Sequence, residues 1–143
     1  MDIKKQWKGY KIIADLEEVA KLLTPDETGF NLEQCYDECG VKDPDYLEHE
    51  LSAELAKGVQ RKGSCVVVSG SFYGVCVVKT RIAAENSGRG KRTGWRVYSL
   101  VVPSAQTAIV IGVTLHSNND DNISDAEREI LKRLIKQVEE EFD

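Results

Sequence analysis

The sequence lacks any apolar run long enough to cross a bilayer, which takes about 20 consecutive apolar residues. It also lacks a basic opening segment followed by an apolar one, the pattern of a secretory signal peptide. The composition, with 41% hydrophobic and 30% charged residues, is typical of a globular protein. We therefore expect a cytoplasmic protein without a membrane partner, folded as a single domain over residues 1–143.

Histidine is scarce, with 2 residues in 143, and no Ser-His-Asp or Cys-His pattern is recognisable. Two glycine-rich stretches also fail to match nucleotide-binding motifs. GRGKRT has Glu85 where a phosphate-binding loop needs its first glycine, and SGSFYG leads into a strand pattern rather than a helix. These absences predict an activity that needs no cofactor.

The chain has no C-x-x-C pair, the usual sign of a zinc knuckle. Cys35 and Cys39 lie at helical spacing with Leu32 and Tyr36 on one apolar stripe. The remaining two cysteines, Cys65 and Cys76, lie in valine-rich segments. We interpret all four thiols as small buried hydrophobes and expect no metal; a structural zinc site is the alternative.

Acidic residues are almost absent from residues 61–100, which carry eight cations and a single acid, Glu85. The chain as a whole has net charge -5, and the segments on either side are both acidic. A basic patch inside an acidic shell attracts a polyanion, although pairing with the neighbouring acidic helices would explain the pattern too. A metal-dependent nuclease is disfavoured, because it needs clustered carboxylates near the cations.

Hydrophobic periodicity predicts an α+β fold with an antiparallel-rich sheet of four to five strands, N-terminal helices and a C-terminal amphipathic helix. A short strand and a helix lie within residues 9–23, and residues 25–44 form a polar insertion containing one short helix. A further helix over 43–58 precedes four β-branched runs at 64–70, 74–83, 94–102 and 107–116. Ser124 and Glu127 form a capping box for the closing helix.

Strand alternation assigns side chains to faces of this sheet. On the last strand we expect a core face made of Ile109, Ile111, Val113 and Leu115. The opposite face, of Ala108, Val110, Gly112, Thr114 and His116, is expected to be open. If the strand registers agree, one concave surface presents Lys79, Arg81, Arg96, Tyr98 and His116, beside Arg89, Lys91 and Arg92 on the preceding loop.

Such a surface suits RNA. Arginine and lysine bind phosphates, an aromatic ring stacks on a base, and lysine, tyrosine or histidine can move a proton to or from a ribose oxygen. The residues themselves thus indicate RNA binding or metal-independent RNA cleavage.

Four stretches resemble one family in order and spacing: Lys79-Thr80-Arg81, the loop GKRTG at 90–94, Trp95-Arg96-Val97-Tyr98 and Asn122-Ile123-Ser124. The family is the RelE/ParE toxin superfamily, the toxins of type II toxin–antitoxin modules, and the similarity is to its RelE/HigB-like branch. It covers about 65 residues of the second half of the chain, and YKIIADLEEVAKLL also fits the family's opening strand and helix.

This resemblance implies a RelE-like fold and a metal-independent mRNA endoribonuclease, acting on free or ribosome-bound mRNA by attack of a 2'-hydroxyl, with an antitoxin protein as partner. Lys91 and Arg96 would bind the scissile phosphate, and His116 or Tyr98 would transfer a proton. The expected RNA-binding residues are Lys79, Arg81, Arg89 and Arg92.

The chain also departs from the family pattern. Leu115 and Ser117 replace a tyrosine and a lysine that many relatives carry, and the net charge is acidic. The alternative is therefore a non-catalytic RelE-like fold that binds a protein or nucleic-acid partner through its basic patch. A ParE-like action on gyrase is also left open.

Overall fold

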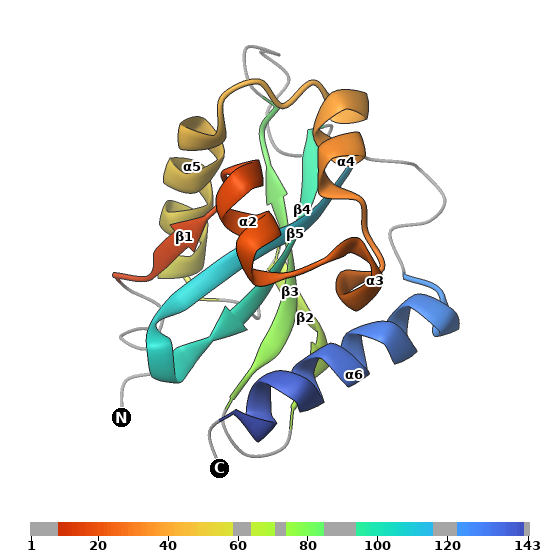
Figure 1. Cartoon of the computed structure of the whole chain (residues 1–143). Coiled ribbons are helices and arrows are strands. Elements are labelled where there is room, and N and C mark those ends of the chain that lie inside the picture. Colours follow the sequence, from red (N-terminus) through yellow and green to blue (C-terminus); the bar gives the residue numbers. More distant parts are fainter. Residues whose placement is uncertain (1–8, 59–63, 71–73, 85–93, 116–122, 142–143) are drawn as a thin grey trace.

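The structure is a computed structural model that describes residues 9–58, 64–70, 74–84, 94–115 and 123–141 (Figure 1). Its first half holds one short strand and four helices: β1 (Lys11–Ile13), α2 (Leu16–Leu22), α3 (Pro25–Thr28), α4 (Leu32–Cys39) and α5 (Pro44–Ala56). The second half holds β2 (Ser64–Ser69), β3 (Cys76–Ile82), β4 (Trp95–Val102), the 3-10 turn η2 (Pro103–Ala105), β5 (Thr107–Leu115) and α6 (Asp125–Glu140). The predicted α+β class is confirmed.

The five strands form one sheet in the order β1-β5-β4-β3-β2. Strands β2 to β5 follow one another as an antiparallel meander, whereas β1 pairs with β5 in parallel. Figure 1 shows α2, α3 and α6 in front of the sheet and α5 on its far side. The sheet is therefore the middle layer of three, and all eight residues of β4 are buried.

The helix ends follow from local side-chain chemistry. Ser124 and Glu127 form the predicted capping box of α6, whose buried residues are Leu131, Leu134 and Ile135. The polar insertion at 25–44 contains two helices rather than the single one expected. The additional helix, α3, begins with a second capping box between Thr24 and Glu27.

The expected faces of β5 are wrong because a β-bulge interrupts the alternation. Tyr98 lies opposite Gly112 but Ser99 lies opposite Val110, so Ile111 is an extra residue in the β4–β5 ladder. Ile109 and Val113 consequently lie on opposite faces.

The expected open face is also wrong, because helices cover both sides of the sheet. Ala108 and Val110 are fully buried. Leu115, which was assigned to the core, is 57% exposed instead.

Helix α4 packs along β5 beyond the point where β1 ends. The Cys39 thiol lies 3.5 Å from the carbonyl oxygen of Val113 and donates a hydrogen bond to it. The indole Nε1–H of Trp95 in turn donates to the carbonyl oxygen of Cys39 at 2.9 Å. The Cys39 thiol thus gives the backbone of β5 a side-chain partner beyond the end of β1, and Trp95 fixes the end of α4 beside it.

We expect Gly112→Ala to lower the free energy of unfolding by about 1–3 kcal/mol, as overpacking of a core does. A Cβ at Gly112 would come within 2.6 Å of the Phe30 ring, so the ring would have to move. Urea denaturation followed by circular dichroism measures the change. Ser99→Ala is the matched control, since the buried Ser99 hydroxyl has no hydrogen-bond partner among the described residues and its removal should not destabilise the fold. Equal stability of Gly112→Ala and wild type would contradict the close approach of Phe30.

Candidate nucleic-acid interface

The strand registers bring four of the predicted RNA-contacting residues onto one face of the sheet. Arg81 of β3 lies directly opposite Arg96 of β4, and Lys79 lies opposite Tyr98. Directly opposed residues of antiparallel strands point to the same side. Three cations therefore lie together at one end of the β3–β4 pair, as the alternation predicted.

Burial divides this group into two parts. Lys79 and Arg81 are partly exposed, whereas Arg96 is 1% exposed and Tyr98 is 4% exposed. The Tyr98 ring stacks on Phe30, with 5.2 Å between ring centroids and 30° between ring planes. Of these four residues, Lys79 and Arg81 are thus the ones that a large ligand can reach, whereas Arg96 and Tyr98 are buried on the neighbouring strand.

Arg96 places a permanent positive charge inside the protein, because a guanidinium does not lose its proton in proteins. Its Nη1 donates to the carbonyl oxygen of Trp95 at 3.4 Å. Arg81 lies directly opposite Arg96 in the ladder, so two cationic side chains occupy neighbouring strands at this end of the sheet.

The cover over Tyr98 is the main feature that the sequence analysis missed. Phe30 comes from the polar insertion, far from Tyr98 in the sequence, and nothing in the periodicity links the two. Gly112 was the available signal, because a glycine within a β-branched strand often marks a place where another group approaches closely.

The four remaining predicted site residues are Arg89, Lys91, Arg92 and His116, and all of them lie outside the described residues. The interface as described therefore consists of the partly exposed Lys79 and Arg81, with Arg96 and Tyr98 buried on the neighbouring strand.

The cysteines are structural in character. All four are free thiols, Cys76 being buried and the others partly buried. Burial raises the pKa of Cys76 from 9.0 to about 11. Burial, with the neighbouring Cys35 and Glu38, raises that of Cys39 to about 11. Thiols of this kind stay protonated and unreactive at neutral pH.

Within the described ranges, no three His, Cys, Asp or Glu side chains gather closely enough to hold a metal ion. Over the same ranges, no helix combines the length and apolar character that crossing a bilayer requires. Comparison of the chain with protein-family models, curated proteins and solved structures finds no match. The function is therefore inferred from this chain's own residues and charges.

Proposed function

We propose that this protein binds RNA through a basic face that presents Lys79 and Arg81 of β3, with the cations that follow them in the sequence, Arg89, Lys91 and Arg92, as further contacts. The observation that carries the proposal is the cross-strand pairing of Arg81 with Arg96, next to Lys79, in a chain of net charge -5. Lys79 and Arg81, the partly exposed cations of this face, attract phosphates of a nucleic-acid strand, while the acidic remainder of the surface repels them.

Binding without cleavage is the form that the geometry favours. Metal-independent cleavage needs a group that can reach the ribose 2'-hydroxyl and take its proton. The described candidate for that role, Tyr98, is 4% exposed and lies under Phe30. RNA cleavage is the second candidate function. It is supported by the sequence resemblance to the RelE/ParE toxins, and its proton transfer would then fall to His116.

We expect Lys79→Ala/Arg81→Ala to weaken binding of a fluorescent single-stranded RNA about tenfold, because two phosphate contacts are lost. The slope of log affinity against log salt concentration should become less steep by about 1.4, at about 0.7 per phosphate on a single strand. Fluorescence anisotropy over a series of KCl concentrations measures both quantities.

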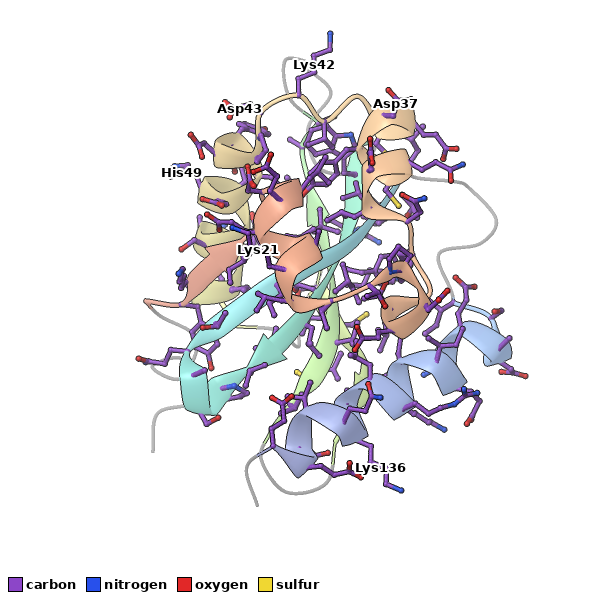
Figure 2. The ribbon with its side chains drawn as sticks, in the orientation of Figure 1. Lys21, Asp37, Lys42, Asp43, His49 and Lys136 are labelled. Carbon is purple, nitrogen blue, oxygen red and sulfur yellow. The ribbon has the colours of Figure 1, made fainter. Side chains whose placement is uncertain are left out.

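Arg133→Ala/Lys136→Ala is the matched control, because it removes the same charge from exposed positions of α6. Figure 2 shows Lys136 pointing away from the body of the protein. Identical affinity and salt slope for wild type and Lys79→Ala/Arg81→Ala would refute the proposed face.

A translating extract separates binding from cleavage. We expect the wild-type protein to bind the mRNA and leave it intact. Cleavage that is lost in His116→Ala and kept in Tyr98→Phe would instead establish the toxin-like activity, and an antitoxin partner would become the next protein to seek.

A further inference from the structure

A second surface of the molecule has features of a binding site and lies apart from the basic face. It is a groove of about 820 Å³ on the side of the sheet that α2, α3 and α6 cover, bounded by α2, the β4–β5 hairpin and the last turns of α6. Its floor is apolar and consists of Ile13, Leu100, Val102 and Ile109. Figure 1 shows these three elements surrounding the front of the sheet at its lower end.

One wall of this groove exposes an aliphatic side chain. Leu22, on the last turn of α2, is 51% exposed, one of the two large apolar side chains that stand out at the described surface. The floor residues beside it are buried, so the apolar surface that Leu22 leaves in contact with water is its own side chain. An apolar partner side chain placed against Leu22 would remove that surface from water and stabilise a complex.

The rim of the groove is acidic. Glu27, Glu140 and Glu141 line it, and none of the described lining residues is a lysine or an arginine. Glu140 and Glu141 stand at the C-terminal end of α6, whose last turn has no basic residue. Negative charge at a helix C-terminus is unfavourable, because it meets the negative end of the helix dipole. A positively charged partner would relieve this cost.

The β4 and β5 part of the floor offers no strand edge to a partner. Strand β4 is hydrogen-bonded to β3 and β5, and Thr107–Ile109 of β5 is bonded to β1 and β4. A partner lying over β4 and β5 can therefore contact only side chains. An amphipathic helix, which satisfies its own backbone and presents an apolar stripe, binds in this way.

We propose that this acidic-rimmed groove binds the apolar face of a positively charged amphipathic helix from another protein. The leucine-type stripe of the helix lies on the floor beside Leu22, and its flanking lysines or arginines pair with Glu140 and Glu141. This proposal is independent of RNA binding, since the basic face uses other residues, of opposite charge.

The probe is a synthetic helix of leucine and lysine about 18 residues long, with leucines at i, i+3, i+4 and i+7. Isothermal titration calorimetry with the full chain should give one saturable site. A peptide of the same composition without a continuous apolar face should bind at least tenfold more weakly. Amide chemical shifts should change at Leu22, Val102, Thr107 and Val138, which line the groove.

Two variants test the contacts directly. Leu22→Ser and Glu140→Lys/Glu141→Lys should each weaken binding of the probe about tenfold. Glu140→Lys/Glu141→Lys should at the same time raise the Tm of the free protein by a few degrees, since it removes the unfavourable charges at the end of α6. If Glu140 and Glu141 served only to stabilise the fold, their replacement would not weaken binding of the probe while raising the Tm.

The matched control is Asp37→Lys/Glu38→Lys, the same change of charge at exposed positions in the last turn of α4. Asp37 and the Lys136 end of α6 lie at opposite ends of the molecule (Figure 2). If both charge variants weaken binding of the probe equally, or if the two peptides bind equally well, the binding is only a general attraction of cations to an acidic protein. Either result would overturn the proposal. Self-association of the chain that disappears in Leu22→Ser would overturn it too, by making a second copy the occupant.

Discussion

Replacing Trp95 with alanine is expected to lower the free energy of unfolding by about 3–5 kcal/mol, the usual cost of truncating a buried aromatic residue. Trp95 is 1% exposed, its indole donates to Cys39, and its ring meets Tyr46 edge-on with 6.2 Å between centroids. A domain of this size is stable by about 5–15 kcal/mol, so the change removes a large share. Urea denaturation followed by far-ultraviolet circular dichroism measures it.

Trp95→Phe is the graded control. It keeps an aromatic ring against Tyr46 but loses the hydrogen bond to Cys39, so we expect a smaller loss of about 1–3 kcal/mol. A change below 1 kcal/mol in Trp95→Ala would contradict the packing described for α4 and α5. Tyr46 also donates to the carbonyl oxygen of Ala83 at 2.8 Å, so the same cluster holds the ends of β3 and β4 beside the basic face.

The second large effect is a loss of stability in alkaline solution. The pKa of Cys76 is raised by burial to about 11 in the folded state, against 9.0 for an ordinary thiol. Folding therefore favours the protonated thiol. The free energy of unfolding that this preference contributes is fully present below pH 9, and it is lost as the pH rises from 9 to about 11. The loss amounts to roughly 3 kcal/mol for Cys76 alone.

Urea denaturation at a series of pH values under reducing conditions measures this slope. Cys76→Ala should make the fall in the free energy of unfolding between pH 9 and 11 less steep, because one titrating group is gone while Cys39, whose pKa is also raised to about 11, remains. Val77→Ala, a truncation at the neighbouring buried position, should lower stability by the same amount at every pH. If Cys76→Ala keeps the full wild-type slope, the alkaline loss belongs to other groups, such as Tyr10, whose pKa burial raises to about 12.

The elements of the fold could be predicted because their signals are local. The capping box of Ser124 and Glu127 and the stripe of Leu131, Leu134 and Ile135 are complete within one helix. The bulge between Tyr98 and Ser99 could not be predicted, because it depends on how β4 and β5 fit together under the helices. Helix α3 was not predicted, although its capping pair Thr24 and Glu27 is visible in the sequence and gave a local signal for it.

In the candidate site, too, the features with local signals could be predicted and those that depend on distant parts of the chain could not. The shared face of Lys79 with Arg81, and of Arg96 with Tyr98, follows from alternation within single strands. Their burial does not follow from it, because the cover comes from Phe30, which is distant in the sequence. The acidic-rimmed groove was also missed, since its walls come from three separate parts of the chain.

The parallel edge strand has a consequence for the order in which the chain folds. The β4–β5 hairpin joins residues only a few positions apart, whereas the pairing of Lys11 with Thr107 joins residues roughly a hundred positions apart. Closing a loop costs entropy that grows as about (3/2)RT ln n, so this pairing costs roughly 2–3 kcal/mol more than the hairpin. We therefore expect the β2–β5 meander to form first and β1 to dock afterwards onto the edge of β5.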